Sequence, residues 1–434
     1  MKRKRVLLMV FILIFSINVG MLGESGAFGK EKDLSQATGK AMKITKKTNY
    51  TTDDMTQGYN SFALRSLKEA IAGEEKGKNV MISPASLMFA LDMAAMGAKG
   101  KTYSQMAALF KKGATKRDLL NFAVDYRKAL EKSGMVNIAN SLWINEDNLK
   151  ENNVKINEGY LNLLRKYFTA ATASMPFDEA AKNKINDWIS EHTNGMIRKG
   201  VDDLSPSTIM LIINAIAFEG KWAEEYTDYH INENGKFKNS DGEFEDAKML
   251  SSEENIYLES DTAKGFLKYY EGEKYAFMAM LPFDENISIN DYVASLSDDA
   301  LEKFYNSRTR EDVDTVTPAF SFDYNIVMNK MLKKMGMTKA FRKNANFFKM
   351  LDASTVTPNI LLYIGSVIQK THIELDEKGT KAAAVTIIDM KCETTAVQPV
   401  RQKKEVILNR PFLFAIMDTE TGTPVFTGIL NTLK

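Results

Sequence analysis

The stretch LDEKGTKAAAVTIIDMKCE at residues 375–393 determines how the rest of the chain is interpreted. After Gly379 its β-branched and small residues are typical of a strand. The glycine, the three consecutive alanines and the polar end are typical of an exposed loop. The stretch is therefore predicted to be a loop that can also become a strand.

Side-chain parity indicates which strand this loop could form, because successive side chains of a strand point to opposite faces. One face of such a strand would carry the uncharged residues Thr380, Ala382, Ala384, Thr386, Ile388, Met390 and Cys392. The opposite face would carry the charged residues Lys381, Asp389, Lys391 and Glu393. The alanines are small enough to enter between strands without overpacking, which costs roughly 1–3 kcal/mol. The loop suits insertion into a sheet. The alternative is an ordinary edge strand, or a hairpin with an alanine-rich turn.

Composition is that of a globular protein of one large domain or two smaller ones. The chain has 434 residues, 44% hydrophobic and 26% charged, which is enough for a sizeable core. The net charge is +1, and this balance indicates neither a nucleic-acid partner nor an acidic membrane surface. The single cysteine, Cys392, rules out an internal disulfide, so the protein must depend on its core for stability.

Residues 1–27 are predicted to be a secretory signal peptide. The basic segment KRKR at 2–5 precedes a nearly continuous apolar run at 6–22, and small residues suited to cleavage follow. The protein is therefore expected to be secreted and extracellular. The alternative is an uncleaved signal anchor, because the apolar run nearly spans a bilayer. Residues 28–57 are polar and are predicted to be a flexible extension, which leaves 58–434 as the folded domain.

Hydrophobic periodicity and capping residues predict a mixture of helices and strands. Ser83 and Pro84 are typical of a helix start, and the apolar run 209–218 is typical of a strand buried on both faces. Helices are expected at 59–72, 84–96, after a capping box at 102–105, 158–167, 180–193 and 325–335. Strands are expected at 79–82, 136–144, 209–218, 275–281, 317–324, 360–375, 405–408, 412–417 and 425–430. Helices crowd the first half and strands the second, which suits an α+β fold.

Six motifs in this order resemble those of the serpin family of serine protease inhibitors. They are NVMISPAS at 79–86, GAKGKT with QM at 97–106, INDW with TNG at 185–195, NAI at 214–216, FEGKW at 218–222, and NRPFLF at 409–414 with Gly422, Phe426 and Gly428. The resemblance covers residues 57–434. It implies a metastable serpin fold with three β-sheets, about nine helices and an exposed C-terminal reactive-centre loop.

The resemblance also implies a mechanism: a protease cuts the loop, whose hinge enters the central sheet and traps the acyl-linked protease. The hinge residues that match the family are Glu377, Gly379, Thr380, Ala382, Ala383, Ala384 and Val385. Family spacing places the reactive bond at Glu393-Thr394, and Cys392-Glu393 or cleavage after Lys391 stay open. The expected partner is a serine protease, or alternatively a cysteine protease. The expected inhibitor is monomeric, uses no cofactor or metal and binds no nucleic acid.

Residues that control sheet opening also follow from the resemblance. Trp222 resembles the family's tryptophan at the breach, the end of the central sheet where the hinge enters. Ser83, Ser86 and Asn214 resemble the shutter, the polar cluster under the sheet. The family usually has a histidine there, and Gln369 takes its place. Glutamine forms hydrogen bonds but does not titrate near neutral pH.

The sequence also suggests two other functions. A hydrolase is disfavoured, because His192, His230 and His372 lie in no nucleophile or metal motif, and a Cys392–His372 pair would depend on a mobile loop. The other is a non-inhibitory serpin-like carrier, suggested by Gln369 and by a loop several residues longer than usual.

Overall fold

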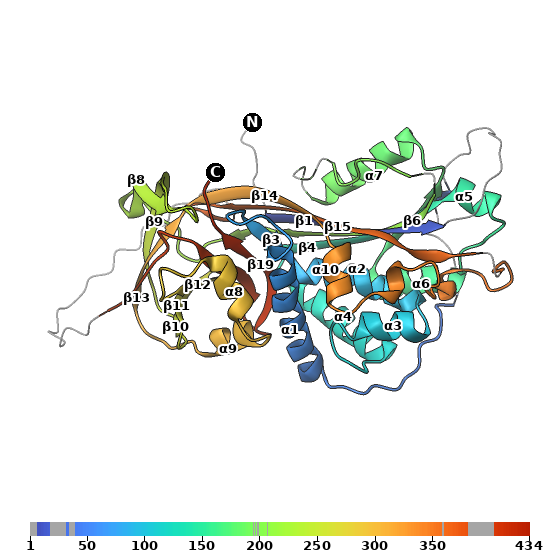
Figure 1. The fold of residues 1–434 in the computed structure, drawn as a ribbon, viewed down its shortest axis with the longest axis horizontal. Coiled ribbons are helices and arrows are strands. Elements are labelled where there is room, and N and C mark those ends of the chain that lie inside the picture. Colours follow the sequence, from blue (N-terminus) through green and yellow to red (C-terminus); the bar gives the residue numbers. More distant parts are fainter. Residues whose placement is uncertain are drawn as a thin grey trace.

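The computed structural model describes residues 7–17, 32–33, 40–193, 195, 197, 199–205, 207–357, 360–380 and 403–434. A long central sheet crosses the molecule, and most of the helices pack beneath one face of it (Figure 1). Smaller sheets fill one end. The mixed α+β architecture predicted from the sequence is confirmed.

The central sheet has the strand order β14-β15-β1-β6-β4-β5-β2. Neighbouring strands are antiparallel, except for the parallel pair β4 and β5. The bounds are β14 Phe320–Val327, β15 Leu362–Leu375, β1 Leu7–Ile17, β6 Thr208–Phe218, β4 Val136–Asn145, β5 Ala171–Met175 and β2 Lys32–Asp33. Every residue of β6 is buried, as its continuous apolar run predicts.

The other sheets carry the C-terminal part of the chain. A six-stranded sheet comprises β10 Tyr257–Glu259, β11 Ala263–Tyr269, β12 Tyr275–Pro282, β18 Phe412–Asp418, β19 Thr423–Leu430 and β3 Val80–Ile82. A four-stranded sheet comprises β17 Lys404–Ile407, β13 Val313–Pro318, β9 Phe244–Glu254 and β8 Ile231–Lys238. A two-stranded pair joins β16 Gly379–Thr380 to β7 Gly220–Lys221.

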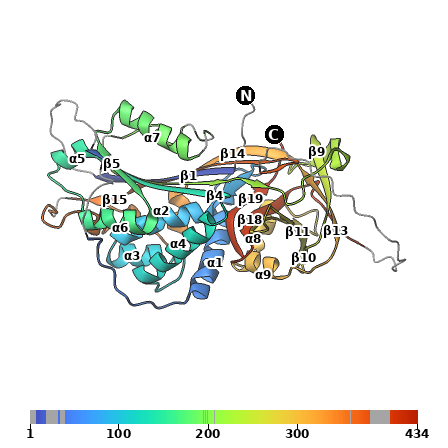
Figure 2. The ribbon, with the colours of Figure 1, turned by 180° about the vertical axis from the view of Figure 1, so that it is seen from behind.

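Ten α-helices lie in the described part of the chain. They are α1 Thr52–Ile71, α2 Pro84–Gly97, α3 Gly100–Ala107, α4 Lys116–Glu131, α5 Glu146–Glu151, α6 Glu158–Phe168, α7 Glu179–His192, α8 Ile289–Ser295, α9 Ala300–Asn306 and α10 Asn329–Lys334. Helix α7 lies on the face of the central sheet opposite to the other long helices, as Figure 2 shows. Every residue of α2 is buried, because this apolar helix packs under the sheet with other helices around it.

Several predicted element bounds are corrected. Helix α1 begins at Thr52 rather than at 59, because Thr51 and Asp54 form a capping box. Thr102 is no helix cap: α3 begins at Gly100, and the Thr102 hydroxyl accepts a hydrogen bond from the Asn346 amide. The strand predicted at 317–324 is two strands in different sheets, β13 and β14, and the helix expected from 325 begins at Asn329.

The segment Leu7–Ile17, which lies within the predicted signal peptide, forms strand β1 between β15 and β6. Its register runs from Leu8 opposite His372 to Ile17 opposite Leu362, and it is antiparallel to both neighbours. Cleavage of residues 1–27 stays a prediction, and its consequence would be to empty this strand position. Within the described residues, no helix is long and apolar enough to cross a membrane.

Candidate functional site

The predicted hinge begins where β15 ends, and the chain there turns away from the central sheet. Asp376 and Gly379 exchange backbone hydrogen bonds of 3.3 Å across a tight turn, and the Lys378 amide donates to the Asp376 carboxylate at 2.9 Å. Gly379 and Thr380 then pair with Lys221 and Gly220 of β7. The start of the hinge is therefore docked beside the sheet and is not part of it.

Gly379 is required at this turn by two independent features of the backbone. Its φ is +120°, a conformation that other residues rarely adopt. A Cβ atom there would lie 2.5 Å from the Gly220 carbonyl oxygen and 2.7 Å from the Lys221 Cα. Any other residue would therefore push the hinge off β7, which is a physical reason for a glycine at this point.

Trp222 fastens the hinge through both its side chain and its backbone. Its indole N–H donates to the Asp376 carbonyl at 3.0 Å, and its backbone amide donates to the Lys378 carbonyl at 3.3 Å. The Tyr226 amide donates to the Glu377 carbonyl at 3.0 Å. Trp222 is 3% exposed, so this residue predicted at the breach is a core aromatic that also reaches the hinge.

An aromatic cluster holds Trp222 in place. Its ring stacks on Tyr270 with centroids 4.5 Å apart and meets Tyr226 edge-on. The Lys268 ammonium lies 4.3 Å from the centroid of Tyr226 and 5.4 Å from that of Trp222, and it pairs with Glu254 at 2.7 Å. Each aromatic pair contributes roughly 0.5–1.5 kcal/mol beyond its buried area. These contacts pack the Trp222 ring in the core at the point where the predicted hinge docks.

A salt bridge holds the side chain of Glu377. Lys248 of β9 lies 3.0 Å from the Glu377 carboxylate and 3.3 Å from that of Glu233. Partial burial alone would raise the pKa of Glu377, but a hydrogen bond from its own backbone amide and the Lys248 ammonium outweigh burial, so the pKa lies below its ordinary value. Lys248 of the four-stranded sheet thus holds the hinge residue Glu377 in its charged form.

Lys248→Ala is expected to loosen the hinge. Both partners are partly exposed, so the loss should be modest: about two- to fivefold faster hydrogen exchange of the Tyr226 amide, which donates to Glu377. Because the pKa of Glu377 is lowered on folding, its anchoring is present above the ordinary glutamate pKa and is lost as pH falls below about 4.3. The variant should show less of this acid dependence.

The control for this experiment is Lys236→Ala, which removes a lysine paired with Asp246 in the exposed β8–β9 hairpin. It should leave exchange of the Tyr226 amide unchanged. Equal exchange in wild type and in the Lys248 variant, measured across pH 3.5–6, would contradict the role of this lysine.

Three of the four residues predicted at the shutter, Ser83, Ser86 and Gln369, are joined by hydrogen bonds beneath the central sheet. Gln369 of β15 donates to the Ser83 carbonyl at 3.1 Å and accepts from the Ser83 amide at 3.3 Å. The Ser83 hydroxyl donates to the Val425 carbonyl at 2.8 Å and accepts from the Ser86 amide at 3.1 Å. Gln369 is completely buried, and as an uncharged amide it satisfies both backbone groups of Ser83 without a titrating group.

Asn214 lies on β6, at the same level of the sheet as Gln369, because both are opposite residue 11 of β1. Its amide donates to the Asn140 side-chain oxygen at 2.8 Å, and Asn140 in turn donates to the Phe168 carbonyl at 2.8 Å. The Ser86 hydroxyl and the Asn214 side-chain oxygen are buried and have no hydrogen-bond partner among the described residues. The position between β6 and β15 is therefore flanked at this level by one polar residue on each neighbouring strand.

Part of the predicted site lies outside the described residues. It comprises Ala382, Ala383, Ala384, Val385, Lys391, Cys392, Glu393 and Thr394. The structure also adds hinge contacts that sequence reasoning missed, namely Lys248, Tyr226 and Gly220. Lys248 belongs to a polar strand with no motif of its own, so no local signal could have indicated it. Tyr226 and Gly220 flank Trp222 closely enough that the Trp222 motif could have suggested them.

The histidines considered for hydrolysis take part in local structural contacts. His192 stacks on Trp188 with ring centroids 4.2 Å apart, and His230 contacts Thr227 at 3.1 Å in a short turn. His372 of β15 lies 2.7 Å from the Asp323 carboxylate of β14. Within the described part of the chain, no group of three potential metal ligands comes together.

A long central sheet, two smaller sheets at one end and a chain segment after β15 that docks on β7 together define the fold class of this chain. A family model described as Serpin (serine protease inhibitor) matches residues 57–432. The chain therefore belongs to the serpin family, and the predicted serpin fold is confirmed. Serpins are generally inhibitors that act on target proteases, mostly serine proteases, rather than enzymes.

Solved structures and relatives agree with this assignment. The native state of tengpin, a thermophilic serpin, is 32% identical, with a TM-score of 0.79, and the match covers 93% of this chain and all of tengpin. Human neuroserpin (Homo sapiens) is 27% identical over 372 residues, covering 82% of this chain and 86% of neuroserpin. A serpin-like protein of Thermococcus kodakarensis is 29% identical, covering 85% and 83% of the two chains.

Proposed function

We propose that the protein is a suicide-substrate inhibitor of a protease. The observation that carries the proposal is the hinge docked on β7 and Trp222, next to a strand position between β6 and β15. Cleavage of the loop would free the chain beyond Thr380 to enter the sheet antiparallel to both neighbours. The acyl-linked protease would then be carried along and distorted.

The dimensions of the sheet support this proposal. Strand β1 is 11 residues long and pairs along its length with both β6 and β15. A loop segment from 380 to 390 has the same length, and its uncharged parity carries small residues and no proline. An inserted strand would be flanked by Asn214 of β6 and Gln369 of β15, the two residues opposite position 11 of β1.

The protease and the bond remain proposals drawn from the sequence. Glu393-Thr394 is the proposed reactive bond, with Cys392-Glu393 and cleavage after Lys391 as alternatives. A glutamate at the bond suits a serine protease with a basic specificity pocket. We propose that the inhibitor acts outside the cell as a monomer, after export directed by residues 1–27.

The alternative is a non-inhibitory serpin-like carrier. Gln369 suggested it, because the family usually has a histidine at this position. In the structure Gln369 bonds both backbone groups of Ser83, so the substitution leaves this part of the shutter intact. That contact favours the inhibitor over the carrier.

The test is incubation with trypsin-, chymotrypsin-, elastase-, Glu-specific and papain-like proteases. Denaturing gels, the mass of the released C-terminal peptide and the melting temperature are measured together. A denaturant-stable complex with one protease is expected, and the peptide mass locates the bond. Clean cleavage by every protease, with no complex and no gain in heat stability, would contradict the proposed inhibitor function and favour the carrier function.

A further inference from the structure

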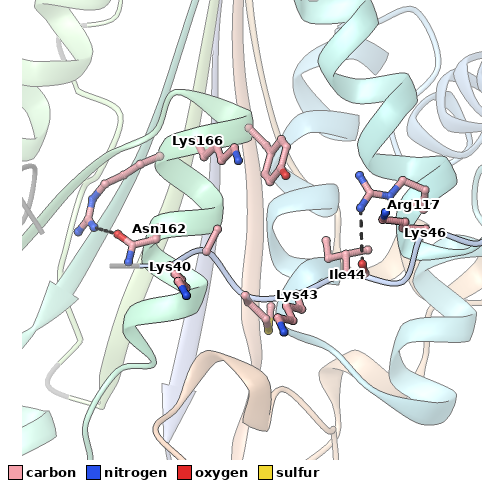
Figure 3. Close-up of a pocket in the computed structure, with 11 residues that line it drawn as sticks. Lys40, Lys43, Ile44, Lys46, Arg117, Asn162 and Lys166 are labelled. Atoms are coloured by element: carbon pink, nitrogen blue, oxygen red, sulfur yellow. Dashed lines mark hydrogen bonds between the residues drawn. The ribbon is translucent and has the colours of Figure 1, made fainter. Parts of the chain in front are cut away.

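Two pockets away from the hinge differ in the charges that line them. One lies between residues 40–46, α4 and α6 (Figure 3), and the charged side chains among its described lining residues are all cationic. The other lies between the β8–β9 turn, the loop before α8 and the segment after β17, and its volume is about 290 Å³. Its charged lining residues are of both signs: Lys238, Asp241, Glu285 and Arg410. This second pocket, here called the hairpin pocket, is therefore neutral overall.

Hydrogen bonds hold the β8–β9 turn in place. The Asn239 side-chain oxygen accepts from the Asp241 and Glu243 amides, each at 3.0 Å. The Ser240 amide donates to the Asn431 carbonyl at 2.9 Å, which ties the turn to the chain just after β19. This wall of the hairpin pocket is therefore built from the protein's own contacts and needs no ligand to form.

The opposite wall is held by Arg410. Its guanidinium donates to the Pro282 carbonyl at 2.5 Å and lies 3.7 Å from the Glu285 carboxylate. The Arg410 side chain is 15% exposed, whereas that of Glu285 is 77% exposed. Glu285 can therefore turn toward a ligand, while Arg410 is a fixed part of the wall.

Three side chains of the hairpin wall are available to a ligand. Those of Lys238, Ser240 and Asp241 are exposed and make no hydrogen bond or ion pair with any described residue. Together they offer an ammonium donor, a carboxylate acceptor and a hydroxyl that can do both. A ligand with groups that donate and accept matches this set. An ion of either sign would be repelled by the two like charges in the pocket.

Two exposed aromatic rings flank the hairpin pocket. Phe244 is 70% exposed and pairs across the hairpin with Lys238, so the two side chains share one face of β8 and β9. Phe283 is 45% exposed and directly follows Pro282, whose carbonyl binds Arg410. In the described part of the chain four large hydrophobic side chains are exposed, and two of them lie here. Single exposed hydrophobic residues are common, but two rings beside one polar pocket indicate a shared use.

We propose that the hairpin pocket binds an uncharged saccharide. Each sugar hydroxyl donates and accepts hydrogen bonds, and the C–H groups of a sugar ring pack on the negative face of an aromatic ring. One ring would bond Lys238, Ser240 and Asp241, and its neighbours in the chain would lie against Phe244 and Phe283. The volume is near the lower end for small-molecule sites, which suits one sugar ring rather than a larger cofactor. The pocket shares no residue with the hinge, so it stands whether or not the loop traps a protease.

The test is calorimetric titration of the protein, purified from expression of the full chain, with maltotriose, cellotriose, mannotriose and triacetylchitotriose. Saturable binding of at least one of these neutral trisaccharides is expected. Asp241→Ala with Phe244→Ala should weaken that binding by about tenfold or more, because a hydrogen bond to a charged group and an aromatic contact are lost. Both residues are exposed, so this variant should keep the melting temperature of the wild type.

The matched control is Asp228→Ala with Tyr229→Ala, which removes a carboxylate and an exposed aromatic ring at the opposite end of β8. The length of β8 puts roughly 25 Å between the two pairs, so the control should keep affinity within about twofold. Retention on insoluble cellulose or chitin, blocked by the soluble trisaccharide, would support the proposal with a polysaccharide as the source. Binding of the soluble sugar alone would support it with a free oligosaccharide.

Three outcomes would overturn the proposal. They are no saturable binding of any neutral trisaccharide, equal weakening by the two pairs of substitutions, and tighter binding of a sulfated trisaccharide than of its neutral parent.

Discussion

A Thr380→Glu variant is expected to be cleaved as a substrate by the target protease and to trap almost none of it. Thr380 pairs with Gly220 at the end of the docked hinge, so it is among the first residues that would enter the sheet. The loop residues that would share a strand face with Thr380 are all uncharged. A glutamate there would have to be buried between strands without a partner, which costs at least several kcal/mol. Insertion would then be slower than hydrolysis of the acyl-enzyme.

The effect is measured as the moles of inhibitor consumed per mole of protease inactivated, which should rise by about tenfold or more, since 1.4 kcal/mol in the insertion barrier already gives tenfold. The cleaved variant should also lack the rise in melting temperature. Lys381→Glu is the matched control, because it places the same residue on the charged parity, which would face solvent. Normal trapping by the Thr380 variant, or equal failure of both variants, would argue against parity-dependent insertion.

The parts of the fold that the sequence predicts best are those with a strong local pattern. The apolar run of β6 and the Ser83-Pro84 start of α2 lie where expected. The hairpin of β8 and β9 was missed because most of its residues are polar and its one exposed aromatic, Phe244, breaks the separation of polar from apolar residues. The run at 317–324 has a continuous strand propensity, and nothing local indicates that the chain changes sheets at Ala319.

The candidate site likewise has residues that the sequence could indicate and contacts that it could not. Trp222, Gln369 and Gly379 could be singled out through the serpin resemblance, and the structure shows their contacts; their roles at a breach, a shutter and a hinge stay predictions. The contact of Lys248 with Glu377 joins strand β9 to the turn that follows β15, and such a contact depends on tertiary structure alone.

A chain that keeps residues 1–27 is expected to inhibit far less than a chain that starts at residue 28. Strand β1 occupies the position between β6 and β15 and pairs with both over its whole length. The loop can take this position only after β1 has left, because neighbouring strands are about 4.8 Å apart and the gap holds one strand. With β1 in place, insertion is slow and the protease escapes by hydrolysis. Removal of the segment during export would therefore also activate the inhibitor.

The two chains are compared for the yield of denaturant-stable complex with the same protease, and a difference of about tenfold or more is expected, since β1 must exchange two ladders of backbone hydrogen bonds. Leu13→Pro in the longer chain is a second variant that leaves the length unchanged. Proline removes a backbone donor and is not tolerated in a central strand, so β1 should leave the sheet and trapping should recover. Leu13→Ala keeps the backbone donor and should not restore trapping. Equal yields from the long and short chains would show that β1 does not compete with the loop for the position between β6 and β15.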